Sequence, residues 1–127
     1  MTIPQMAERR DGVVIIVSNI AALKGSTVPG VHGMSKAADT ALVRNYACEW
    51  GASNIRTNAI LPGLIKADFA RAPWENDKLR KARDANISLR HLGEAAEIGG
   101  IAAFLGSKAA SFIIGQTIVA VGVVTIA

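Results

Sequence analysis

The fold of this 127-residue chain is decided by residues 11–19, which read DGVVIIVSN. Residues 13–17 are five consecutive apolar, mostly β-branched residues, and turn-forming residues bound them on both sides. A short apolar run without polar alternation is typical of a strand that is covered on both faces. Such strands belong to parallel sheets packed between helices, so this stretch predicts an α/β fold.

The chain on either side of this strand continues the α/β pattern. Apolar residues recur at helical spacing from Met34 to Trp50, and Gly51 follows as a helix-ending residue. Residues 55–61 and 117–121 are predicted strands. Further helices are predicted over residues 67–72, 74–85 and 94–105, and residues 1–10 are compatible with a helix. This order implies a parallel sheet of about three strands with right-handed crossovers. No strand is expected before residue 13, which leaves that edge of the sheet without a neighbour.

Composition supports a packed core and excludes several classes of protein. Half of the residues are apolar and 19% are charged, which excludes disorder. The single cysteine, Cys48, excludes an internal disulfide and is compatible with a reducing compartment. The N-terminus lacks a signal-peptide pattern, and the uncharged residues 112–127 fall short of the ~20 needed to span a bilayer. These features predict a cytoplasmic protein that is not bound to a membrane.

Most of the net charge of +4 lies in residues 66–90, which carry seven basic and four acidic side chains. A nucleic-acid surface is one interpretation of this segment. A solvated helix face is the better one, because acids are interleaved and no aromatic platform accompanies the bases. We therefore expect no nucleic-acid partner. With two histidines, one cysteine and no paired spacing, the sequence also predicts no metal site.

Residues 12–122 resemble the C-terminal half of a short-chain dehydrogenase/reductase, first through residues 12–71, GVVIIVSNIAALKGSTVPGVHGMSKAADTALVRNYACEWGASNIRTNAILPGLIKADFAR. The later stretch LRHLGEAAEIGGIAAFLGSKAASFIIGQTIV resembles that family too. The resemblance implies a partial Rossmann-like, doubly wound parallel sheet of about three strands with flanking helices. We expect residues 1–127 to form a single truncated domain of this kind.

The resemblance also implies four catalytic positions, of which one matches the family; the fourth, an upstream asparagine, would lie before residue 1. In that family a tyrosine four residues before a lysine is the general acid/base, and the lysine holds the nicotinamide ribose. Here Lys36 is present, but His32 stands at the tyrosine position. Asn19 occupies the place of the serine that binds the substrate oxygen, thirteen residues earlier. A working acid/base pair of His32 and Lys36 is one interpretation, and a replacement at an unused site is the one we favour.

On the cofactor side, the resemblance retains only the rim beside the nicotinamide. Pro62, Gly63 and Ile65 match the family's PG loop. A dinucleotide needs a glycine-rich turn that opens a helix, and no two of the twelve glycines stand two residues apart. We therefore expect no cofactor on the isolated chain, although NAD or NADP is what the resemblance implies.

Several functions agree with this pattern. The favoured one is a dehydrogenase-like fragment, a pseudoenzyme without oxidoreductase activity on its own, that self-associates as a homo-oligomer. In an alternative, a complementing dehydrogenase chain supplies the missing half, and the pair acts on a small alcohol or carbonyl with NAD(P). A third possibility is a non-catalytic protein-interaction module. The uncharged residues 117–127 are either an interface or an ordinary buried last strand.

Overall fold

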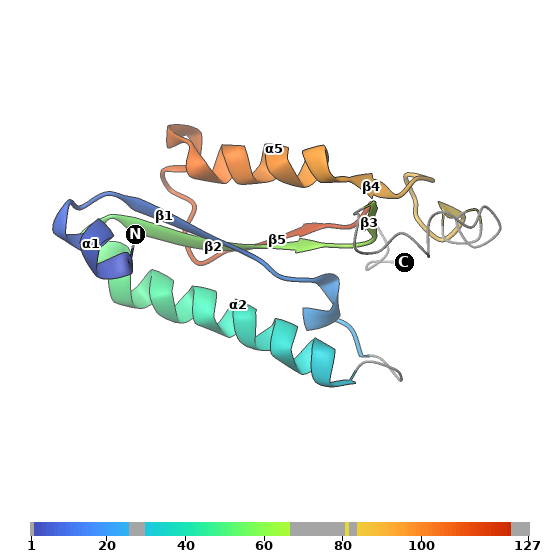
Figure 1. Ribbon diagram of the computed structural model, residues 1–127, viewed down its shortest axis with the longest axis horizontal. Coiled ribbons are helices and arrows are strands. Elements are labelled where there is room, and N and C mark those ends of the chain that lie inside the picture. Colours follow the sequence, from blue (N-terminus) through green and yellow to red (C-terminus); the bar gives the residue numbers. More distant parts are fainter. Residues whose placement is uncertain (1, 26–29, 67–80, 82–83, 123–127) are drawn as a thin grey trace.

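The computed structural model describes residues 2–25, 30–66, 81 and 84–122. A parallel sheet lies between two helices, with α2 on one face and α5 on the other (Figure 1). The strands are β1 (Gly12–Val17), β2 (Ile55–Pro62) and β5 (Thr117–Ala120), and the helices are α2 (Gly30–Trp50) and α5 (Ala95–Gly106). The α/β fold predicted from the sequence is confirmed.

The strand order is β1-β2-β5, with both pairs parallel. Gly12 lies opposite Ile55 at one end of the first pair, and Val17 lies opposite Ile60 at the other. Each crossover passes over one face of the sheet, so α2 follows β1 and α5 precedes β5 on the opposite face. The carboxyl ends of all three strands therefore meet at one edge, which is where parallel α/β proteins place their ligands.

Strand β2 carries the core on both of its faces. Ala59 and Leu61 pack against Val43 of α2, whereas Ile60 between them packs against Leu105 of α5. This alternation is the period of two that a strand imposes on its side chains. All five of these side chains are fully buried. The central strand thus joins both helix layers.

Strand β1 is only partly buried. Its side chains from Val13 to Ile16 are half-buried, and Val17 is 55% exposed. The strand is covered on both faces, as expected, since Ile16 packs against the cluster of Val43 and Ile15 against that of Leu105. Its partial exposure follows from its place at the edge of the sheet, where, as the sequence predicted, it pairs only with β2 among the described strands.

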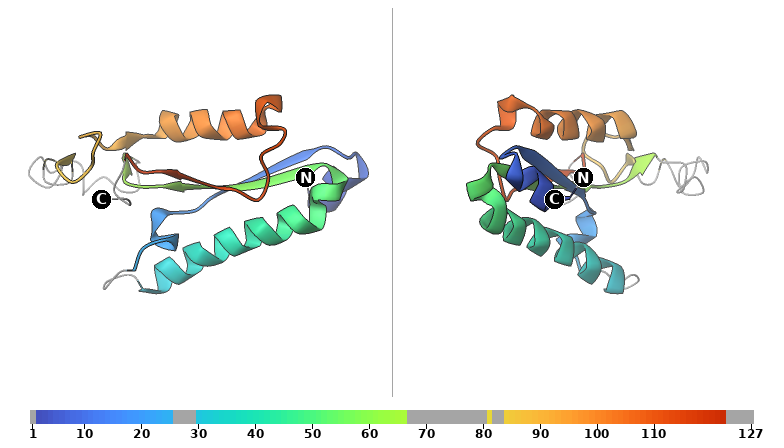
Figure 2. Two further views of the ribbon diagram at one scale, coloured as in Figure 1. Left: turned by 180° about the vertical axis from the view of Figure 1, so that it is seen from behind. Right: turned by 60° about the vertical axis from the view of Figure 1, so that its left-hand side comes forward.

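Short elements complete the described part and are visible in Figure 2. They are α1 (Ile3–Glu8), η1 (Ile20–Ala22), η2 (Gly51–Ser53), β3 (Ile65–Lys66), β4 (Gly93–Glu94) and η4 (Lys108–Ala110). Strands β3 and β4 form a second, two-residue parallel ladder that the sequence did not predict. It places the segment after β2 directly beside the start of α5. Gly93 permits this approach, since a Cβ there would lie 2.5 Å from Ile65 Cδ1.

Most other boundaries agree with the predictions to within one or two residues. Helix α2 begins at Gly30, earlier than the first apolar residue of the predicted helical pattern, Met34. The predicted helix over residues 67–72 and most of that over residues 74–85 lie outside the described residues. Within the described ranges, none of the helices combines the length and the apolar character that crossing a membrane requires.

Candidate functional site

The predicted catalytic positions gather at the carboxyl end of β1 and the first turns of α2. Helix η1 joins the two, and its Ala21 carbonyl oxygen lies 3.2 Å from where a Cβ on Gly33 would stand. This close approach brings the segment of Asn19 against the helix that carries His32 and Lys36. The structure therefore assembles the three segments that the family resemblance implied, and the state of each side chain decides what they can do.

Asn19 is committed to a local structural role. Its Oδ1 accepts a hydrogen bond of 2.8 Å from the backbone N–H of Ala21, which makes it the N-cap of η1. A serine or asparagine that bound a substrate oxygen would have to offer a hydrogen-bond donor at this point. The cap uses the amide oxygen and not the Nδ2 donor, but it fixes the orientation of the half-buried side chain that carries both.

Lys36 forms an ion pair with a residue that the sequence analysis did not single out. Its Nζ lies 3.5 Å from Oδ2 of Asp39, and both side chains are about 30% exposed. The available signal was the spacing, because residues three apart on a helix face the same side. Asp39 is therefore a fourth member of the site, one turn along α2.

Asp39 is anchored by the end of β1. The hydroxyl of Ser18 lies 2.9 Å from Asp39 Oδ2 and 3.1 Å from the carbonyl oxygen of Lys36. Ser18 is nearly buried, and its backbone N–H donates to Ile60 in the neighbouring strand. This hydroxyl fixes the carboxylate beside the lysine, so the lysine's charge is balanced by a neighbour that the fold holds in place.

His32 lies in the first turn of α2 and is exposed to solvent. Its carbonyl oxygen accepts a hydrogen bond of 2.8 Å from Ser35 Oγ, which tightens this end of the helix. His32 and Lys36 are four residues apart and so lie on one helix face. Helix geometry brings them to the same surface, but an exposed imidazole has none of the enclosure that a positioned general acid/base needs.

The PG loop is present where it was predicted, at the carboxyl end of β2. Pro62 is buried as the last residue of that strand, and Gly63 donates its backbone N–H to Ala120 at 2.9 Å. Ile65 belongs to β3, and the carbonyl oxygen of Leu64 accepts from Gly93 at 3.0 Å. The PG loop therefore leads directly into the β3–β4 ladder and is held by its hydrogen bonds.

These residues do not fit a nicotinamide dinucleotide. A pyrophosphate is held by free backbone N–H groups at a glycine-rich turn that opens a helix. After β1 the chain enters the three-residue η1, whose Ala21 N–H is already capped by Asn19, and after β2 the Gly63 N–H is already bonded. With Lys36 held by Asp39, the described part of the chain offers a nicotinamide-side rim without a cradle for the phosphates.

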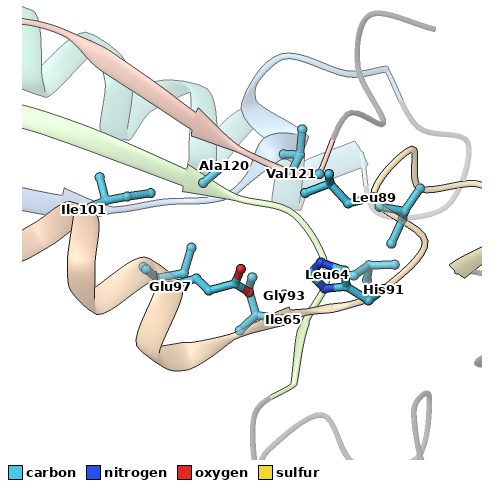
Figure 3. A pocket seen from close by; sticks show the side chains of 12 residues that line it. Leu64, Ile65, Leu89, His91, Gly93, Glu97, Ile101, Ala120 and Val121 are labelled. Carbon is cyan, nitrogen blue, oxygen red and sulfur yellow. The ribbon is translucent and has the colours of Figure 1, made fainter.

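A separate cavity of about 210 Å³ lies on the α5 side of the same edge (Figure 3). Its walls come from the PG loop, the segment before β4, α5 and the end of β5. The lining residues are Leu64, Ile65, Ile87, Leu89, His91, Gly93, Glu97, Ile98, Ile101, Ala120, Val121 and Gly122. None of the predicted catalytic residues lines it.

The remaining sequence predictions concern metals and the basic segment. Among the described residues, no group of three histidine, cysteine or acidic side chains is placed to hold a metal ion. Most of the basic residues between positions 66 and 90 lie outside the described ranges. Of those described, Lys66 pairs with Glu94, and Arg90 donates to the carbonyl oxygen of Ala85.

Comparison with protein families gives a match over residues 1–122 to the family described as Enoyl-(Acyl carrier protein) reductase. The chain is 38% identical over 120 residues to dehydrogenase/reductase SDR family member 4 of Bos taurus, and 42% identical over 124 residues to that of Oryctolagus cuniculus. These matches cover 94% of this chain but only 43% and 46% of the two relatives. The chain thus spans less than half the length of the curated relatives it matches.

Solved structures agree with this result. A short-chain type dehydrogenase/reductase from Mycobacterium ulcerans superposes with a TM-score of 0.89 at 35% identity, covering 94% of this chain and 44% of that one. A 4-hydroxyisoleucine dehydrogenase complexed with NADH superposes with a TM-score of 0.91 at 27% identity, covering 98% of this chain and 52% of that one. The parallel sheet with its flanking helices is therefore Rossmann-like.

Proposed function

The chain belongs to the short-chain dehydrogenase/reductase family. From this premise we propose that this chain by itself is a pseudoenzyme. It constitutes one truncated Rossmann-like domain that performs no oxidoreduction on its own and associates with copies of itself. The family's reaction transfers a hydride to or from NAD(P), so the proposal rests on the residues that would have to hold the cofactor and move the proton.

The observation that carries the proposal is the carboxylate of Asp39 beside Lys36. By family resemblance this lysine holds the nicotinamide ribose. Here a carboxylate that Ser18 fixes in place lies 3.5 Å from the amino group. The ion pair itself is weak, but the fixed negative charge stays beside the amino group and offsets the effect of its positive charge on a neighbouring acid/base group.

The other two catalytic positions support the same conclusion. Asn19 uses its side-chain oxygen to cap η1, and His32 presents its ring to solvent. A histidine ring is also shorter than a phenol, so its nitrogen does not reach the position of a tyrosine hydroxyl four residues before the lysine. Proton transfer requires donor and acceptor within about 3.2 Å, which a shorter and exposed ring does not secure.

The experiment is to titrate the purified chain with NADH and NADPH while following their fluorescence, and then to assay reduction of a simple ketone. We expect no saturable binding at micromolar cofactor and no turnover. The triple variant Asn19→Ser, His32→Tyr, Asp39→Ala introduces the family's serine and tyrosine and removes the carboxylate beside Lys36. It should also be inactive, because the described part of the chain has no phosphate cradle. Circular dichroism confirms that each sample is folded. Micromolar cofactor binding, or ketone reduction by either form, would refute the proposal.

A second candidate is that another chain supplies the dinucleotide-binding half. The observation in its favour is the open edge of β1, which has no second partner among the described strands. A strand from a complementing chain could pair there. Co-expression with the first half of a related dehydrogenase tests this idea. Ketone reduction by the mixture alone would establish the complementation, and its absence would leave the pseudoenzyme as the better description.

A further inference from the structure

The cavity on the α5 side has the composition of a small-molecule site. Most of its lining residues are aliphatic, among them Ile65, Leu89 and Ile101, and two are polar, His91 and Glu97. Ligand sites combine mostly apolar walls with a few placed polar groups. The cavity also lies at the carboxyl end of the parallel sheet, the edge where such sheets bind ligands.

The walls are held in a fixed shape by two glycines. Gly93 pairs with Ile65 in the small ladder, where no larger residue would fit. Gly122 has a φ of +58°, and a Cβ there would lie 2.7 Å from Ile87 Cγ2. The carbonyl of Gly122 also accepts from the N–H of Leu89 at 3.3 Å. These contacts join the end of β5 to the segment before β4 and define the mouth of the cavity.

The cavity is suited to a ring or a branched hydrocarbon. Its volume is about 210 Å³. An apolar cavity of about 150 Å³ is enough for benzene in another protein. A ligand with one six-membered ring and a one-carbon substituent therefore fits the cavity, whereas a dinucleotide does not.

Both polar groups favour a ligand that donates hydrogen bonds. Glu97 reaches from α5 into the cavity (Figure 3), and its Oε2 accepts 2.7 Å from the backbone N–H of Glu94, which fixes the carboxylate. His91 Nδ1 lies 3.0 Å from the carbonyl oxygen of Leu92. Because a carbonyl only accepts, Nδ1 carries the proton in this contact, and Nε2 of the neutral ring is left as an acceptor.

The charge of the cavity also favours a ligand that carries a positive charge and donates hydrogen bonds. Among the described lining residues, Glu97 is the one formally charged side chain. Of the described cations next in sequence to the lining, Lys66 pairs with Glu94, and Arg90 donates to the carbonyl of Ala85. Glu97 is exposed, so its carboxylate is accessible to a cation that approaches from solvent.

We propose that this cavity binds a small hydrophobic amine, with its ring or branched body against the aliphatic walls and its protonated amino group on Glu97 and His91. The interaction is reversible binding and involves no covalent step. It uses none of the family's catalytic positions, so the proposal stands or falls independently of the oxidoreductase question.

Three ligands of nearly equal size test the proposal by calorimetry on the full chain: benzylamine, benzyl alcohol and benzoate at neutral pH. We expect saturable binding of the amine, roughly tenfold weaker binding of the alcohol, and none of the acid. Equal binding of all three would show that the cavity is merely apolar and would overturn the proposal. Absence of amine binding would overturn it as well.

Variants locate the interaction. Glu97→Gln should lower the affinity for the amine to that for the alcohol, and glutamine can still form the capping contact at this helix position. Ala120→Leu should fill the cavity and abolish binding of both ligands. Glu49→Gln, on the exposed surface of α2, is the matched control and should change neither affinity.

Unchanged amine binding in Glu97→Gln refutes the site. Amine binding seen only after removal of residues 123–127 would mean that the chain occupies its own cavity, and would also refute it.

Discussion

A single carboxylate changes what Lys36 can do. Asp39 accepts a hydrogen bond from the nearly buried Ser18 and lies next to the lysine on the same helix face. The two contacts differ in strength. A hydrogen bond from a shielded hydroxyl to a charged acceptor outweighs an ion pair of 3.5 Å between partly exposed side chains, since such pairs contribute little. The serine therefore fixes the carboxylate, and the lysine adapts to it.

Double-mutant cycles test this ranking. We expect a coupling free energy of about 1 kcal/mol between Ser18→Ala and Asp39→Ala, measured by urea unfolding. The cycle of Lys36→Ala with Asp39→Ala should give at most about 0.5 kcal/mol. Because each cycle subtracts the single changes, helix propensity drops out. A larger coupling for the lysine pair would contradict the account and make the ion pair the fixing interaction.

Residue types could be predicted here, but their partners could not. The motif spacing located Asn19, His32 and Lys36, and the structure brings their segments together. The motif spacing gave no indication that Asn19 would cap η1, because the cap depends on where the chain turns after β1. The spacing of Asp39 from Lys36 was visible, but its bond to Ser18 spans 21 residues and requires the packing of α2 on the strand.

At the scale of elements, β2 packs against both helix layers, and the side chain of its Arg56 forms hydrogen bonds at the end of α5. Nη1 of Arg56 donates to the carbonyl oxygens of Leu105 and Ala110 at 2.8 and 2.9 Å, and Nη2 donates to that of Ser107 at 3.1 Å. Leu105 lies in the last turn of α5, where carbonyls lack intrahelical partners, whereas the carbonyls of Ser107 and Ala110 also accept backbone hydrogen bonds from Ala110 and Ile113. One guanidinium thus closes the turn between α5 and η4.

Arg56→Lys should lower the free energy of unfolding by roughly 1–2 kcal/mol. A lysine retains the charge, but its single ammonium group lacks the fork that reaches three carbonyls. Chemical denaturation followed by circular dichroism gives the value. Arg44→Lys is the matched control, because Arg44 is exposed on α2 and its guanidinium lies 3.5 Å from Thr40 Oγ1, so its change should stay within about 0.5 kcal/mol. Similar losses for both variants would exclude a special role for Arg56.

The elements themselves were largely predictable from periodicity. The three parallel strands, α1 and α5 appear close to where apolar runs and helical spacing put them. One feature was not predictable. The β3–β4 ladder has only two residues in each strand, too few for any periodic signal. The edge position of β1, which accounts for its partial burial, was expected because no strand was predicted before residue 13.

At the scale of the whole molecule, the described surface combines an open strand edge with exposed apolar side chains. Among the described strands β1 pairs only with β2, and Val17 at its end is 55% exposed. Val31 and Met34 in the first turns of α2 are 82% and 73% exposed. An unpaired edge with apolar neighbours favours pairing with another chain. These features support the proposed self-association.

Val17→Lys should therefore reduce self-association. A lysine on an edge strand opposes edge-to-edge pairing, and an exposed position tolerates the change without loss of the core. Sedimentation velocity across a range of concentrations should show the parent chain as a dimer or larger and the variant shifted toward monomer. Phe112→Lys is the control, because Phe112 is fully exposed beyond η4, and its substitution removes an even more exposed apolar group away from the edge of β1. An equal shift in both variants would indicate general stickiness, and a monomeric parent chain would contradict association through β1.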